Sequence, residues 1–275
     1  LYAAALPGVR YNPHVTRAQA YRHALQLIRE TAGEETFLVG CGAPLGPSIG
    51  LVDAMRIGPD TAPTWEPVLA GVRRPFRNED SLPALRNSLR NGMTRAWMHG
   101  RWWINDPDCL LLNPGEHLSL EEVRLSASLI AMTGGSLFLS DDLSALPPSL
   151  LQIAEVVTPP IGLRPQILDW FDTNQPQHLR LDLENASGSW HLLAQINWAD
   201  VPQELPFCQQ IFGLEAGQRY QAREFWSGSD YSLDGERVSL PPIPPHGVRL
   251  LSARPIQPGV PAYLGSNLHI SQGLE

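Results

Sequence analysis

Four short apolar runs constrain the fold of this chain most strongly, because each ends in a polar or acidic cluster and a helix-like stretch separates it from the next. A strand of a parallel sheet reads as a continuous hydrophobic run, since helices cover both of its faces. In β/α barrels the reactive side chains lie where the strands end, on the C-terminal rim. Carboxylates repeated at strand ends therefore indicate acid–base chemistry in a barrel mouth. The runs cover residues 37–42, 55–60, 102–108 and 137–142.

Residues 1–160 alternate strand-like and helix-like segments, which predicts βα units around a parallel sheet. Only four strands are expected here, whereas a complete (β/α)8 barrel takes about 250 residues. The range therefore reads as the second half of a (β/α)8 TIM barrel with two unpaired sheet edges. We expect it to be stable only when residues upstream of Leu1 complete it. The expected strands are 37–40, 55–57, 102–104 and 137–139.

Helix signals separate these strands. Thr16 is placed to cap a first helix that ends at Gly33, and Ser119 with Glu122 three residues later matches a capping box. Another helix is expected to begin at residues 80–81 and to reach residue 95, and a last one should cover residues 147–157. The first helix should bury an apolar stripe made of Ala20, Ala24, Leu27 and Ile28.

From residue 165 the pattern changes to short, partly alternating strands separated by turn residues. Residues 165–275 therefore predict a C-terminal antiparallel β-sandwich domain, whose end we expect to be truncated. Asn185–Gly188 and Asp234-Gly235 are the clearest turns. The expected strands are 178–183, 190–197, 223–226, 238–240 and 248–251.

Composition excludes several classes of function. The 275-residue chain has a net charge of −8 and no cluster of basic residues, which argues against nucleic-acid binding. No apolar run approaches the ~20 residues that span a bilayer, so no membrane partner is expected. All basic residues are arginine, which excludes a lysine nucleophile or base within this stretch. The scattered cysteines and histidines form no metal-binding pattern, so we expect neither a metal nor an organic cofactor.

The second apolar run ends at Asp60, and Arg56 lies four residues earlier, on the same face of a strand. Asp60 is equally well explained as a helix N-cap or turn residue. Arg56 either forms a structural ion pair or anchors substrate hydroxyls. After the third run, Asp106 or Asp108 is a candidate second carboxylate of a catalytic pair. We favour for both the role of bracing the rim. Asp141 and Asp142 are explained in the same way, as residues that brace the rim.

Cys41 lies between two glycines at the end of the first run. Most free cysteines fill cores, but a Gly-Cys-Gly turn on the rim would also place a compact thiol against a sugar face. Because no histidine lies nearby in sequence, thiol catalysis is not expected.

In order and spacing, four motifs together resemble the melibiase-type α-galactosidases, which are glycoside hydrolases of family 36 and its relatives. They occupy residues 40–44, 55–60, 103–108 and 140–143. Residues 1–5 look like the segment that follows the family's nucleophile motif, Lys-x-Asp, on the fourth barrel strand. Residues 242–248 and 265–270 are similar to its C-terminal β-domain.

The resemblance implies a retaining mechanism with two aspartates, one attacking the anomeric carbon and one protonating the leaving oxygen. By motif, Asp60 is the general acid/base, and Arg56 hydrogen-bonds galactose hydroxyls. We expect Arg56 to point mainly to the sugar and not to Asp60. Cys41 and Gly42 would line the sugar pocket. Supporting roles behind these residues fall to Asp53, which matches more loosely, and to Asp106 and Asp108.

The implied parent enzyme hydrolyses terminal α-galactosides, and its nucleophile would precede Leu1. The chain by itself is therefore expected to be inactive. Two alternatives stay open: another α-glycosidase or transglycosidase of the same architecture, and an inactive carbohydrate-binding fragment. The expected partner is an α-galactoside or a related oligosaccharide, and oligomerisation is open. The resemblance favours the cytoplasm, although a chain that starts at Leu1 leaves room for an upstream signal peptide.

Overall fold

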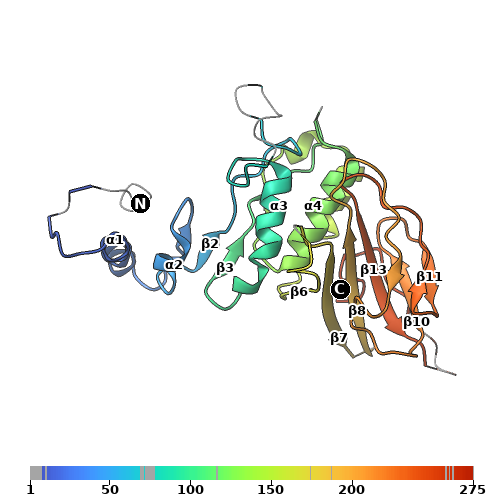
Figure 1. Cartoon of the computed structure of the whole chain (residues 1–275). Coiled ribbons are helices and arrows are strands. Elements are labelled where there is room, and N and C mark those ends of the chain that lie inside the picture. The colour runs from blue at the N-terminus through green and yellow to red at the C-terminus, as the bar shows by residue number, and fades with distance from the viewer. Residues whose placement is uncertain are drawn as a thin grey trace.

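The chain folds into an α/β part followed by an antiparallel β part. The computed structural model describes residues 8–9, 11–68, 71, 78–115, 117–173, 175–186, 188–257, 259, 261 and 263–274. In Figure 1 an arm that carries α1, α2 and β2 extends from a body in which α3 and α4 lie beside the antiparallel sheet.

All strands of the α/β part that the described residues contain run parallel, as expected. The first sheet has the order β1-β2-β3, and β4 pairs with β5. Pro107 and Asp108 separate β3 from β4, and Asp108 has a positive φ of 77°. The strand bounds are β1 Val39–Gly40, β2 Ala54–Arg56, β3 Ile104–Asp106, β4 Cys109–Leu110 and β5 Phe138–Leu139.

Helices connect these strands, and both capping boxes form. The side chain of Thr16 accepts from the backbone of Gln19, and that of Ser119 accepts from the backbone of Glu122, as their sequence pattern predicts. The helices are α1 Arg17–Ala32, α2 Leu45–Ser48, α3 Leu85–Thr94, α4 Leu120–Thr133 and α5 Pro148–Glu155, with short 3₁₀ turns η3 Ala96–Met98 and η4 Leu143–Ala145.

Two helix predictions are wrong in detail. α1 buries Tyr21 and Leu25 instead of the expected stripe, and Leu27 is 63% exposed. α3 begins at Leu85 and not near residue 81, because Pro83 disfavours helical backbone in the residue before it.

The β part contains an antiparallel sheet of the order β11-β10-β13-β8-β7-β6 among the described residues, and a separate pair, β9 with β12. The antiparallel prediction is confirmed, and the pair supplies only a small second layer. Asn185 and Gly188 are paired at the turn between β7 and β8, where a turn was expected. The bounds are β6 Gln166–Ile167, β7 His178–Asn185, β8 Gly188–Ile196, β9 Phe207–Cys208, β10 Tyr220–Glu224, β11 Asp230–Leu233, β12 Arg237–Val238 and β13 Val248–Pro255.

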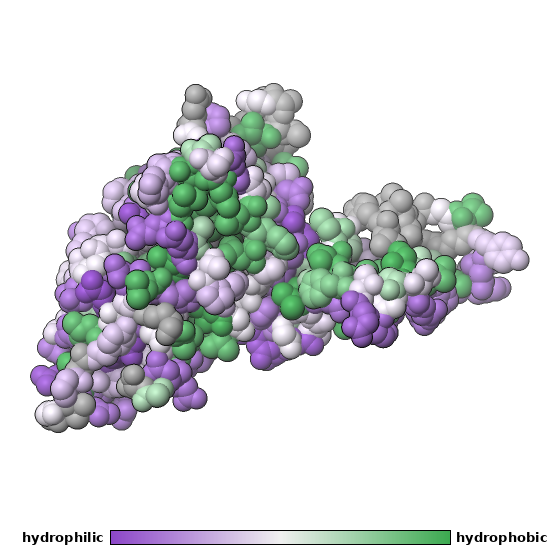
Figure 2. Space-filling model, turned by 180° about the vertical axis from the view of Figure 1, so that it is seen from behind, coloured by the Kyte–Doolittle hydropathy of each residue, from purple (hydrophilic) through white to green (hydrophobic). Residues whose placement is uncertain are grey.

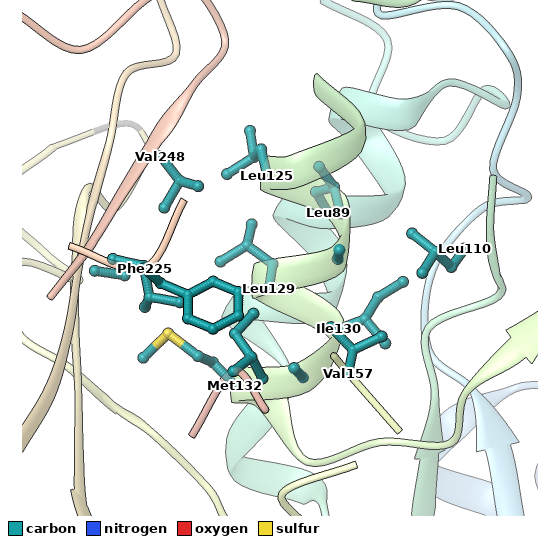
Figure 3. Packing of buried hydrophobic residues seen from close by; sticks show 14 of the residues in the cluster. Leu89, Leu110, Leu125, Leu129, Ile130, Met132, Val157, Phe225 and Val248 are labelled. Carbon is teal, nitrogen blue, oxygen red and sulfur yellow. The ribbon is translucent and has the colours of Figure 1, made fainter. Parts of the chain in front are cut away.

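Helix α4 is the centre of the main core, because it packs between the two parts of the chain. Figure 3 shows Leu129 and Met132 of α4 facing Phe225 of the β part, while Ile130 points toward Leu110 of β4. The opposite face of the antiparallel sheet forms a second core, in which Phe207 is fully buried. The sheet is therefore covered on both faces, by helices on one side and by the β9–β12 pair on the other.

A polar joint also links the two parts. His246, in the turn before β13, has Glu122 Oε1 2.6 Å from its Nδ1 and Asp200 Oδ1 3.0 Å from its Nε2. Its ring stacks on Trp65 with centroids 4.0 Å apart. The second oxygen of Glu122 accepts from the Ser119 N–H at 2.6 Å, so the capping box of α4 belongs to the joint.

One face of the parallel strands is bare, contrary to the expectation that both faces are covered. Val39 and Ile104 occupy the same register position on β1 and β3 and are 45% and 40% exposed, and Phe138 on β5 is 45% exposed. Registered residues of a parallel sheet point to the same side. Hydrophobic surface gathers on the face shown in Figure 2, on the body and along the arm.

Among the described residues, no helix combines the length and the apolar character that crossing a lipid bilayer requires.

Candidate functional site

The candidate site lies where β2 and β3 end, and Arg56 is its centre. Arg56 is the last residue of β2 and is registered beside Asp106, the last residue of β3. Arg56 and Asp106 lie on the same face of the sheet as Val39 and Ile104, because side chains two positions apart along a strand point to the same face. The site therefore opens on the bare face. Asp60 and Asp108 reach Arg56 from the loops that follow the two strands.

The guanidinium of Arg56 contacts three carboxylates. Its Nε donates to Asp106 Oδ2 at 3.0 Å, Nη2 lies 2.9 Å from Asp108 Oδ1, and Nη1 donates to Asp60 Oδ1 at 3.1 Å. Burial alone would lower the pKa of Arg56, but the charges of Asp106 and Asp108 outweigh burial and raise the pKa. Arg56 is therefore a fixed positive charge at the strand ends.

The loops after β2 and β3 are tied together by Asp106 and Asp108. Asp106 Oδ1 accepts from the Asp108 N–H at 2.9 Å, and Asp108 Oδ2 accepts from the Thr61 N–H at 2.7 Å. Thr61 directly follows Asp60, so Asp108 holds the backbone beside Asp60 as well as the arginine that contacts its side chain. Through these hydrogen bonds both carboxylates connect the loops that follow β2 and β3.

Asp60 is the most accessible carboxylate of the group, with 70% of its side chain exposed. Arg56 contacts one of its oxygens, and no partner for the other oxygen is found among the described residues. We expected Arg56 to point away from Asp60, and this expectation is wrong. The contact joins Arg56 to only one oxygen of Asp60, so the pair is not bidentate. One carboxylate oxygen of Asp60 is left free to meet another molecule on the bare face.

Cys41 and Gly42 follow β1, next to the end of β2. Cys41 is exposed and close enough to Arg56 to contribute to its raised pKa. Gly42 has a φ of 58°, a left-handed conformation that glycine adopts without strain. The structure therefore brings Cys41 to the Arg56 cluster.

Asp53 lies apart from this cluster, at the opposite end of β2. Its Oδ2 accepts from Arg29 of α1 at 2.5 Å and from the Leu38 N–H at 2.7 Å. The Leu38 hydrogen bond and then that of Arg29 lower the pKa of Asp53. Asp53 thus fastens α1 to the start of the first two strands.

Sequence reasoning missed Cys109, the first residue of β4. Burial raises the pKa of its thiol, and a hydrogen bond with Asp108 raises it further, while one with Ser140 acts in the opposite direction. Its position directly after Asp108 was the available signal. Cys109 extends the site toward the end of β5.

Asp141, beyond β5, braces the next loop. Its oxygens accept from the N–H groups of Leu112 at 2.7 Å and Asn113 at 3.2 Å. Within the described ranges, no group of three or more histidine, cysteine, aspartate or glutamate side chains is arranged to hold a metal ion.

Comparison with known proteins identifies the fold. No family model matches the chain. The crystal structure of α-galactosidase I from Mortierella vinacea is 15% identical and superposes with a TM-score of 0.63 over 86% of this chain, which spans 62% of that protein. An α-galactosidase from Saccharomyces cerevisiae, solved with raffinose, is 14% identical with a TM-score of 0.59 over 87% of this chain and 68% of that one.

A third similar structure is a GH27 β-L-arabinopyranosidase from Geobacillus stearothermophilus, which is 15% identical with a TM-score of 0.63 over 90% of this chain and 56% of its own length. At such identities the likeness establishes the fold alone. The chain has the fold of the matched part of these glycosidases, which confirms the expected α-galactosidase-type architecture at that level.

Proposed function

We propose that this chain is the C-terminal part of a glycoside hydrolase that cleaves terminal α-galactosides with retention of configuration. The observation that carries the proposal is Asp60, an accessible carboxylate held by Arg56 at the end of a parallel strand. The shared fold supports it, since two of the similar structures are α-galactosidases and one of them was solved with raffinose. The narrower placement in family 36 rests on the sequence motifs.

The α/β part would be the second half of a (β/α)8 barrel in the parent protein. Val39 and Ile104 project from the bare face of the parallel strands, where a barrel packs the side chains of its interior, and Phe138 on β5 is also exposed. Upstream strands would bury these residues and pair with the edge of β1. Asp60 would then line an enclosed mouth.

In this mechanism Asp60 donates its proton to the glycosidic oxygen as the leaving group departs, and then takes a proton from the water that attacks the glycosyl-enzyme. The nucleophilic carboxylate would come from upstream of Leu1, about 5–5.5 Å from Asp60 as in other retaining pairs. Arg56 would hold Asp60 through one oxygen and offer the rest of its charge to sugar hydroxyls. Cys41 and Gly42 would form one wall of the sugar pocket.

The test is leaving-group dependence in the full-length parent. Asp60→Ala should lower kcat/KM about a hundredfold or more for galactosides with poor leaving groups, and much less for activated aryl galactosides, which need no proton at this step. Asp142→Ala, an exposed aspartate after β5 that caps η4, is the matched control and should leave both rates unchanged. Equal losses on both substrate classes in Asp60→Ala would move the acid role to another residue.

A second candidate keeps the architecture and changes the sugar, because a β-L-arabinopyranosidase has a similar fold. A panel of nitrophenyl glycosides, including the β-L-arabinopyranoside, would separate the two by the ratio of their kcat/KM values. A parent with no carboxylate just before Leu1 would instead favour a carbohydrate-binding protein without turnover.

A further inference from the structure

A cavity of about 430 Å³ lies between α4, α5 and the turn that joins β10 to β11. Its volume falls in the range of small-molecule sites, which is about 300–1,000 Å³. None of its lining residues belongs to the Arg56 cluster or to the loops that hold it. It is therefore a separate concave surface, formed jointly by the two parts of the chain.

The cavity has an apolar wall and a polar rim. Ile153 of α5 and Phe225 supply buried apolar surface, and Figure 3 places Phe225 against α4. Gln152 and Asn267 are exposed on the rim, and neither side chain has a hydrogen-bond partner among the described residues. The Nε of Arg124 is buried and also lacks a partner there. The apolar surface of the cavity is thus bordered by polar groups that have no hydrogen-bond partner among the described residues.

Trp226 is a second aromatic side chain on this wall, and its ring is fixed. Its Nε1 donates to Ser128 Oγ on α4 at 2.9 Å, and the Arg124 guanidinium carbon lies 5.6 Å from the ring centre. A ring held in place before a ligand arrives loses little conformational entropy on binding. Trp226 is therefore a prepared platform for a ligand with an apolar face.

The charges at the cavity are already compensated. Arg124 pairs with Glu121 at 2.7 Å, and Arg223 pairs with Asp230 at 3.0 Å. No carboxylate is found among the described lining residues. An anionic ligand would have to compete with these ion pairs, and a cationic one would meet no opposite charge, so the cavity suits a neutral molecule.

We infer that this cavity binds a pyranose unit of a neutral carbohydrate, as a second sugar site outside the Asp60 region. A pyranose presents C–H groups on one face and hydroxyls around its edge. The face matches Trp226 and Phe225, and the edge matches the amides of Gln152 and Asn267. The site would hold an oligosaccharide to the protein and requires no turnover at Asp60.

Calorimetric titration of the full-length parent with methyl α-D-galactopyranoside tests the inference. The double variant Gln152→Ala/Asn267→Ala should weaken binding about tenfold or more, because two hydrogen bonds are lost. Ser149→Trp, at an exposed position on the lining, should block the cavity and abolish the same binding event. Gln210→Ala, an exposed glutamine elsewhere in the β part, is the matched control and should bind like the unaltered chain.

Arg56→Ala separates this site from the proposed active site. Binding that survives Arg56→Ala and is lost in the cavity variants supports the inference, even if the parent shows no turnover. Binding that is lost in Arg56→Ala and unchanged in both cavity variants overturns it. No binding of the galactoside, or binding of inorganic phosphate in its place, also overturns it.

Discussion

At the scale of single residues, Asp108 links the loop after β3 both to Arg56 and to the backbone beside Asp60. It adopts a left-handed backbone conformation, which residues other than glycine rarely take and which aspartate tolerates better than most. Its two oxygens engage Arg56 and the Thr61 N–H. These contacts offset the backbone cost and set the position of the neighbouring Asp60.

We expect Asp108→Ala to lower the free energy of unfolding by about 2–3 kcal/mol, because it removes two buried contacts of the carboxylate and leaves a strained backbone. Asp108→Asn should lose less, since its amide oxygen still accepts from Thr61. Urea denaturation of both variants checks this order, with Asp234→Ala, an exposed aspartate after β11, as control. Equal losses for the alanine and asparagine variants would contradict it.

The sequence predicts some contacts of the site and cannot predict others. The four-residue spacing of Arg56 and Asp60 is local, and the two side chains do meet, but the expectation that both lie on one strand is wrong, because β2 ends at Arg56 and Asp60 lies in the loop after it. Asp106 and Asp108 meet Arg56 across about 50 residues, and this contact depends on the register of β2 and β3, which periodicity does not determine. The same register brings Cys109 toward the cluster.

At the scale of elements, the local signals are the reliable ones. The capping boxes of α1 and α4 are set by side chains three residues apart, so the sequence contains them in full. The buried face of α1 depends on what packs against it, and there the predicted stripe fails. Leu27 of α1 is exposed, whereas Tyr21 and Leu25 pack in one cluster with residues of the parallel strands.

Ser119→Ala should lower the free energy of unfolding by about 1 kcal/mol, because the first turn of α4 loses an acceptor for its free N–H groups. Ser81→Ala is the matched control: the sequence favoured a cap near Ser81, but the structure begins α3 four residues later, so this change should be close to neutral. Chemical denaturation measures both. A loss in Ser81→Ala as large as that in Ser119→Ala would disagree with the observed start of α3.

The segment that connects β6 to β7 should make the free energy of unfolding depend on pH. Burial alone would raise the pKa of Asp169, but hydrogen bonds from His178 and the Gln177 N–H outweigh burial and lower the pKa. A carboxyl whose pKa is lowered by folding stabilises the fold above its unfolded pKa of about 3.9, and this stabilisation is lost as the pH falls through the folded value. Asp169→Asn should therefore be less stable at pH 7, with the difference shrinking below about pH 4. Unfolding curves across this pH range test it, and a constant difference would exclude Asp169 as the source.

At the scale of the whole molecule, the pattern of apolar runs predicts parallel strands and an antiparallel sheet, and both are present. The pattern does not predict which faces of the sheet stay exposed, because an apolar run looks the same in the sequence whether one or both faces of its strand are covered. Val39 and Ile104 are the clearest cases. An exposed apolar face next to an unpaired strand edge favours association with other chains.

The chain in isolation should therefore self-associate at micromolar concentration and bind a hydrophobic dye, and a longer protein that completes the proposed barrel should do so less. Val39→Lys should reduce both effects, since a charge on an edge strand disfavours edge pairing. Val201→Lys is the matched control, because Val201 is also exposed, at 59%, but lies in the β part away from β1. Sedimentation velocity and dye fluorescence give the two readings. Equal effects of the two lysines would place the association elsewhere.

The Glu122 carboxylate has a consequence for cooperativity. Because one of its oxygens fixes the first turn of α4 and the other holds His246, fraying of that turn should loosen the contact between the two parts. Heat should consequently melt the α/β and β parts in a single calorimetric peak, and Ser119→Ala combined with His246→Ala should cost less than the sum of the separate changes.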